Sequence, residues 1–146
     1  MNRQTHKILI DAPPERIWNV LWNDLTYMSW SAAFSAGSRA ETDWKAGSNV
    51  LFLDNTNNGM AGVIVAAIPN ELMSIRHMAE VKNGIVQPDS PASREWMGAM
   101  ENYTLKKAGD QTELTIEVDV TQEYSEYFAR TWPLALNRIK GLAERK

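Results

Sequence analysis

The chain reads ILIDAPPERIW from residue 8 to residue 18, and this stretch decides how the fold begins. From residue 5 to residue 10 the side chains alternate between two faces. This pattern predicts a first strand over residues 5–11. Two consecutive prolines then end the strand. Pro14 is favourable in the first turn of a helix, because the N–H that proline lacks would be unpaired there in any case. The stretch therefore predicts a strand that leads directly into a helix.

Apolar residues continue beyond this proline at helical spacing. They predict a helix of about three turns, with a break expected near Asn23 and Asp24. The residues of its apolar stripe are Ile17, Trp18, Leu21, Trp22 and Leu25.

Six further strands are predicted downstream, because segments of strand character are separated by short polar joints that contain glycine or proline. Such joints favour antiparallel hairpins. One long loop is expected over residues 82–93, a segment with few apolar groups that carries Pro88 and Pro91. The predicted strands cover residues 35–43, 49–54, 60–67, 71–81, 97–107 and 112–121.

The last segment, residues 124–146, is the strongest predicted helix, since its apolar side chains fall on one stripe. Pro133 lies inside it and predicts a kink or two abutting helices, because proline removes a backbone donor. We therefore expect an α+β fold with short helices after the first strand. A curved antiparallel sheet of about six to seven strands would wrap around the long C-terminal helix. Sheet and helix held apart at one end would leave a cavity between them.

The composition excludes several classes of function. The chain has 146 residues and a net charge of −3, which disfavours general binding to nucleic-acid phosphates. It has no cysteine, so disulfides, thiolate nucleophiles and cysteine zinc sites are excluded. The longest apolar run is far shorter than the roughly 20 residues of a membrane span, and the polar start lacks the apolar stretch of a signal peptide. We expect one cytoplasmic domain over residues 1–146, with no cofactor, metal, membrane span or nucleic-acid partner.

Four landmarks in the sequence carry a family resemblance. They are the segment 8–18 quoted above, the segment 27–30, the hairpin pieces 62–64 and 68–72, and the closing helix around Trp132. In their order and spacing they resemble the helix-grip fold of the START (SRPBCC) superfamily, and specifically the C-terminal domain of the activator of the heat-shock-protein-90 ATPase. This superfamily includes lipid carriers, hormone receptors, polyketide cyclases and cochaperone domains, so the resemblance implies a fold and leaves the function open.

Polar candidates for a site lie on two of the predicted strands. Alternation over residues 97–107 places Glu101 and Tyr103 together on the inner face. His77, on the strand predicted over residues 71–81, is the third candidate. A histidine, a carboxylate and a phenol beside an apolar cavity could move protons, or could simply satisfy one another's hydrogen bonds. Nucleophile motifs of the Gly-x-Ser-x-Gly kind and phosphate loops are missing from the sequence. Over residues 71–81, alternation places five residues on the face expected to point inward: Met73, Ile75, His77, Ala79 and Val81.

The six tryptophans and seven methionines are large side chains that can line pockets for apolar ligands. We predict non-catalytic binding of a small hydrophobic or amphipathic molecule, such as a lipid, a sterol or a polyketide-like compound. One alternative is an enzyme of cyclase or hydratase type, with His77 and Glu101 as acid and base and Tyr103 as an orienting donor. Another is a cochaperone-like module that contacts a chaperone. A homodimer is compatible with all three functions. The predicted ligand-binding residues are Trp18, Trp22, Trp30, Phe52, Met73, Ile75, His77, Trp96, Tyr103, Phe128, Trp132 and Leu136.

Overall fold

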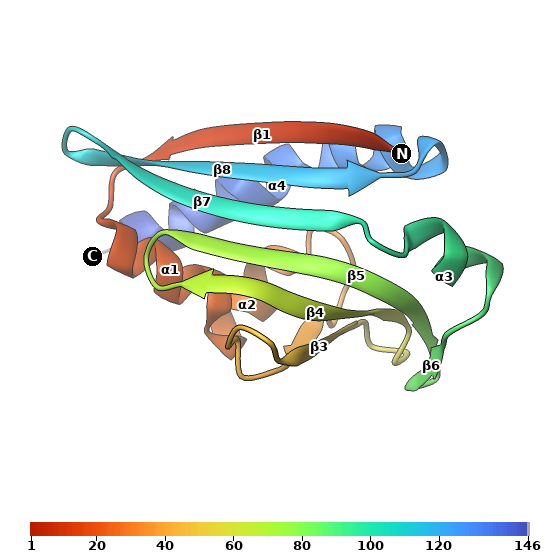
Figure 1. The fold of residues 1–146 in the computed structure, drawn as a ribbon. Coiled ribbons are helices and arrows are strands. Elements are labelled where there is room, and N and C mark those ends of the chain that lie inside the picture. The colour runs from red at the N-terminus through yellow and green to blue at the C-terminus, as the bar shows by residue number, and fades with distance from the viewer. Residues whose placement is uncertain (146) are drawn as a thin grey trace.

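The computed structural model describes residues 1–145, and within them eight antiparallel strands form one curved sheet (Figure 1). Seven strands follow the order β1-β8-β7-β5-β4-β3-β2, and β6 pairs with the end of β5. The predicted α+β architecture is confirmed. The strands are β1 Asn2–Ile10, β2 Arg39–Glu41, β3 Asn49–Leu53, β4 Gly59–Ile68, β5 Leu72–Lys82, β6 Ile85–Gln87, β7 Met100–Ala108 and β8 Gln111–Val120.

Two short helices follow the first strand, as predicted. The first, α1 (Pro14–Trp22), begins at the expected proline, and the second, α2 (Asp24–Ser31), is capped by Asn23. The side-chain oxygen of Asn23 accepts a hydrogen bond from the backbone N–H of Leu25 at 3.1 Å, which satisfies one of the unpaired donors of the new helix. The expected break is therefore confirmed. It also redirects the chain, so that Leu25 leaves the apolar stripe and is 79% exposed.

The C-terminal helix α4 (Ser125–Glu144) lies across one face of the sheet (Figure 1). It runs as one helix through Pro133, so the alternative of two abutting helices is wrong. The physical reason is packing: residues on both sides of the proline, including Trp132, Leu136 and Ile139, are buried against the sheet, which outweighs one lost backbone hydrogen bond. Residue 146, the end of the predicted helix, lies outside the described residues.

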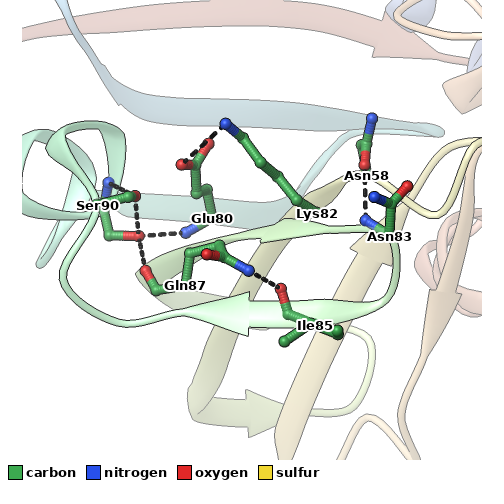
Figure 2. A network of polar contacts seen from close by, with 8 residues as sticks. Asn58, Glu80, Lys82, Asn83, Ile85, Gln87 and Ser90 are labelled. Carbon is green, nitrogen blue, oxygen red and sulfur yellow. Dashed lines mark hydrogen bonds and ion pairs between the residues drawn. The ribbon is translucent and has the colours of Figure 1, made fainter.

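The segment predicted as one long loop is folded, so that prediction is wrong. Asn83 and Gly84 both have positive φ angles, 51° and 78°, and they form the two-residue turn that joins β5 to β6. Asn-Gly is a preferred sequence for such turns, because both central residues need positive φ. Helix α3 (Pro91–Trp96) then begins, with Ser90 as its cap. Figure 2 shows how polar contacts around Gln87 and Ser90 hold this segment against β5.

The strand predicted over residues 35–43 is shorter than expected. Only Arg39–Glu41 is extended, as β2. Gly37 has a φ of 73°, and both the backbone N–H and the hydroxyl of Ser38 bond to the carbonyl oxygen of Ser35. A turn that satisfies its own polar groups competes with strand pairing, so this segment connects α2 to the sheet as a turn.

The main core lies between the sheet and the helices α1, α2 and α4. It is formed by inward residues of β1, β3, β4, β5, β7 and β8 with the buried faces of the three helices, and Ile10, Ile75, Ile116 and Ile139 are fully buried in it. Within residues 1–145, no helix is long and apolar enough to cross a bilayer.

Candidate functional site

A pocket of about 430 Å³ lies between the sheet, the ends of α2 and α3, and the first half of α4. Each of these elements supplies at least one aromatic ring to its wall. The polar groups on the wall come from β5, β7 and β8, and also from the end of α2, the segment that leads into β2, β2 itself and the turn between β3 and β4. The aromatic residues that line it are Tyr27, Trp30, Phe34, Phe52, Trp96, Tyr103, Tyr124, Tyr127, Phe128 and Trp132.

The structure divides the predicted ligand-binding residues into two groups. Met73 and Ile75 are fully buried in the core, because β5 reaches the pocket only from His77 onward. Trp22 packs against Tyr103, with ring centroids 4.7 Å apart, on the side of that ring away from the pocket lining. The residues that line the pocket are Trp30, Phe52, His77, Trp96, Tyr103, Phe128 and Trp132, and those that do not are Trp18, Trp22, Met73, Ile75 and Leu136.

A β-bulge in β5 adds a residue to the pocket that strict alternation would turn away. Opposite β4, Ala79 pairs with Ala61 and His77 pairs with Gly62, so Met78 is the extra residue. A bulge reverses the alternation of the residues that follow it. Glu80 therefore faces the pocket with His77, whereas Ala79 and Val81 are buried outside the main core, contrary to the expected shared face.

A glycine on β4, Gly62, marks this bulge in the sequence. A Cβ on Gly62 would lie 2.6 Å from the carbonyl oxygen of Arg76, so only glycine allows β4 to approach β5 this closely. A glycine inside a strand indicates a bulge or a close backbone approach. The residue pattern thus contained a marker for the irregularity, although not its position on the facing strand.

Three polar residues meet on the wall of the pocket. His77 Nε2 lies 3.0 Å from Glu101 Oε1, and the hydroxyl of Tyr103 donates a hydrogen bond to the other carboxylate oxygen. The register explains this contact, since Glu101 pairs with Ile75 on β5 and His77 follows two residues later on the same face. The carboxylate of Glu101 therefore bridges two side chains from adjacent strands.

Burial determines the protonation of the phenols around this carboxylate. Desolvation raises the pKa of Tyr103 well above its ordinary value, and the negative charge of Glu101 raises it further. The pKa of Tyr27 is raised for the same two reasons, in the same order. Both phenols are therefore neutral at physiological pH, and Tyr103 acts as a hydrogen-bond donor.

The side chain of His77 is 11% exposed and packs near the ring of Phe52, at a centroid distance of 5.7 Å. Its Nδ1 atom is buried and has no hydrogen-bond partner among residues 1–145. The ring therefore contacts the carboxylate of Glu101 through Nε2 alone.

The side chain of Glu101 is 20% exposed, so a molecule in the pocket can reach the carboxylate, whereas both nitrogens of His77 are occupied or buried. No set of three or more His, Asp or Glu side chains in the described part of the chain is arranged to hold a metal ion. The site can thus offer one carboxylate, fixed by two donors, to an occupant that the aromatic walls enclose.

A curved antiparallel sheet that holds a long C-terminal helix across its face is the helix-grip fold. Residues 11–144 match the family model described as "Activator of Hsp90 ATPase homolog 1-like protein". The chain belongs to this family. The resemblance drawn from the sequence is therefore confirmed.

Solved structures show the same fold at low sequence identity. The chain is similar to the Aha1 dimer from Colwellia psychrerythraea, with 22% identity, a TM-score of 0.75, and 99% and 97% of the two chains covered. It is also similar to protein MLL2253 from Mesorhizobium loti, with 15% identity, a TM-score of 0.78, and 99% and 98% covered. Protein CV1439 from Chromobacterium violaceum has 16% identity, a TM-score of 0.69 and full coverage of both chains. A search of the curated proteins found no match.

Proposed function

We propose that this chain binds a small apolar or amphipathic molecule in the pocket between the sheet and α4, without transforming it. The observation that carries the proposal is the pocket itself. Its volume of about 430 Å³ falls within the range of about 300–1,000 Å³ that small-molecule sites occupy. Its walls combine ten aromatic side chains with polar groups, Glu101 among them, and pockets of this kind with a small number of placed polar groups bind small molecules.

The aromatic walls supply the binding energy in this proposal. Burial of apolar surface contributes roughly 25 cal/mol per Å², and rigid aromatic rings lose little conformational entropy when a ligand packs against them. Three tryptophans, Trp30, Trp96 and Trp132, line the pocket. Their fluorescence would therefore report an occupant directly.

Filling the pocket is expected to abolish binding. Ala92 on α3 lines the pocket, so the indole of Ala92→Trp would occupy the space of a ligand. We expect the affinity for the neutral fluorescent probe N-phenyl-1-naphthylamine to fall at least about tenfold, which corresponds to about 1.4 kcal/mol. The measurement is a fluorescence titration of the wild type and the variant.

The matched control is Ala46→Trp. Ala46 is exposed in the turn between β2 and β3 and is not part of the pocket wall, so this variant adds the same side chain elsewhere. It is expected to bind the probe with the affinity of the wild type. Equal affinity in the wild type and Ala92→Trp would contradict the proposed binding site, and failure of the wild type to bind any lipid, sterol, aromatic polyketide or neutral probe would remove the proposed function.

A second function is favoured by the contact between Glu101, His77 and Tyr103. In this alternative the pocket belongs to an enzyme of cyclase type, and Glu101 removes a proton next to a carbonyl group of a polyketide-like substrate. His77 and Tyr103 would position the carboxylate through their hydrogen bonds. The role of His77 is then positioning, because neither of its nitrogens is free to contact a substrate.

Turnover separates the two functions. If the chain is such an enzyme, it will convert an aromatic polyketide precursor, and Glu101→Gln will lower kcat by about 10²-fold or more. His77→Ala is expected to lower kcat less and to change the pH profile, as a positioning residue would. No product formation by the wild type would remove this alternative and leave the binding proposal in place. Product formation at the same rate in the wild type and Glu101→Gln would exclude Glu101 as the base and would also contradict binding without turnover.

A further inference from the structure

The carboxylates on the pocket wall differ in whether their charge is already neutralised. Asp119 pairs with the guanidinium of Arg3 at 2.9 Å and accepts the backbone N–H of Met100 at 2.8 Å. The pKa of Asp54 is lowered by hydrogen bonds from the hydroxyl of Thr56 and from backbone N–H groups of its own turn, and also by the positive charge of Arg39. These two carboxylates are committed to the fold and are not available to an occupant.

Glu101 is not neutralised in this way. Its two partners are the neutral hydroxyl of Tyr103 and Nε2 of His77, and no lysine or arginine among residues 1–145 lies within ion-pair distance of it. The side chain retains 20% of its exposure within an aromatic pocket. At that place in the wall, the pocket offers a carboxylate that has no lysine or arginine partner among the described residues.

Glu80 adds a second carboxylate to the same pocket, and Figure 2 shows its contact with Lys82. Its backbone N–H is held by the hydroxyl of Ser93 at 2.8 Å, but the nearest cation to its carboxylate is Lys82, at 3.9 Å. The Lys82 side chain is 64% exposed, whereas that of Glu80 is only 17% exposed. An ion pair that is long and open on one side compensates little of the charge of Glu80.

The one arginine on the pocket wall does not offset these charges. The guanidinium of Arg39 is bound by the carboxylate of Glu41, the carbonyl oxygen of Asp54 and the side-chain oxygen of Asn57. Its donors are therefore engaged by a carboxylate of β2 and by the turn between β3 and β4. An anionic group in the pocket would find no free cation among the lining residues that the structure describes.

We propose that the occupant of this pocket is an amphipathic amine, with an apolar body between the aromatic walls and a positively charged nitrogen beside Glu101. This inference rests on the proposed binding function. A carboxylate attracts an ammonium group strongly when water is partly excluded, and the faces of tryptophan and tyrosine rings favour a cation as well. The same charges reject an apolar carboxylate, which gives the pocket its specificity.

Three probes that differ only in their head group test the charge. Decylamine is cationic at neutral pH, decanol is neutral and decanoate is anionic, while their apolar chains are the same. Tryptophan fluorescence titrations are expected to give decylamine an affinity at least about tenfold higher than decanoate, with decanol between them. The comparison uses the wild type alone, so it does not depend on whether a variant folds.

The variant Glu101→Gln locates the effect. It keeps the shape of the side chain and removes the charge, so decylamine affinity is expected to fall about tenfold while decanol affinity changes less than about twofold. The matched control is Glu113→Gln, which removes the same charge from β8 outside the pocket wall and should leave the preference for the amine unchanged.

The outcomes separate this inference from the function on which it rests. Equal affinities for the three probes, or a preference for decanoate, would overturn the amine inference and leave apolar binding intact. A preference for decylamine that Glu101→Gln and Glu113→Gln reduce equally would assign it to the overall charge of the protein and would overturn the inference too. If none of the probes bind, both proposals fail.

Discussion

Trp30→Ala is expected to lower the free energy of unfolding by about 4 kcal/mol, the middle of the usual range for deletion of a buried tryptophan. Trp30 is 2% exposed, and its ring lies 5.1 Å from that of Tyr27 and 6.2 Å from that of Trp132. Its indole N–H also donates to the carbonyl oxygen of Leu21 at 3.3 Å. The variant should melt about 12 °C below the wild type in a thermal scan followed by circular dichroism.

The matched control is Trp96→Ala, which deletes the same side chain from the rim of the same pocket. Trp96 is only partly buried, and its contacts are with Tyr124 and Phe128 at centroid distances of 5.9 and 6.2 Å. We expect a loss of about 1 kcal/mol of stability together with weaker binding of N-phenyl-1-naphthylamine. If Trp96→Ala destabilised the protein as much as Trp30→Ala, the deeper burial of Trp30 would not account for its contribution to stability.

The sequence could predict a pocket, but it could not show which tryptophans line it. Every tryptophan satisfies an apolar pattern, whether its ring fills the core or faces a hollow. Trp22 and Trp30 lie on consecutive helices, but only Trp30 reaches the pocket. The difference depends on how α2 turns after Asn23, and that angle is a tertiary property which periodicity does not contain.

The polar candidates were easier to predict, because alternation along a strand fixes the face of each side chain. Glu101 and Tyr103 follow this rule on β7, and their contact with His77 requires only that β5 and β7 be neighbours. On β5 the alternation fails at Met78, because this extra residue shifts the strand and brings Glu80 to the pocket. A bulge is set by the facing strand as much as by its own sequence, so the alternation of β5 alone could not reveal it.

The folded segment after β5 was missed for a different reason, since its signals were present in the sequence. Asn83-Gly84 is a strong hairpin signal, and Ser90 followed by Pro91 is typical of a helix start. The prediction of a loop over residues 82–93 rests instead on Pro88 and on the low apolar content of this segment. As a consequence α3 was not expected, although it carries Ala92 and Trp96 to the pocket wall.

Two glycines of β4 help to position the pocket, because they let the backbone of β4 come close to β3 and β5. Gly59 and Gly62 both face neighbouring strands at distances that leave no room for a Cβ. At Gly62 the neighbour is β5 and its bulge, and at Gly59 it is β3, where Phe52 stands beside His77. Glycine therefore sets the positions of two pocket residues without contributing a side chain to the site.

Gly59→Ala tests this dependence and should lower the free energy of unfolding by about 3 kcal/mol, because its Cβ would meet backbone that cannot move away cheaply. That Cβ would lie 1.7 Å from the carbonyl oxygen of Phe52 and 2.8 Å from its carbonyl carbon, so β3 must shift, and Phe52 with it. We expect a melting temperature about 10 °C lower and weaker binding of N-phenyl-1-naphthylamine. The matched control is Gly141→Ala on α4, which has open space around it and should gain up to about 1 kcal/mol from its better helix propensity. Melting of Gly59→Ala at the wild-type temperature, with unchanged probe affinity, would show that β3 accommodates the methyl group and that the glycine does not position the pocket.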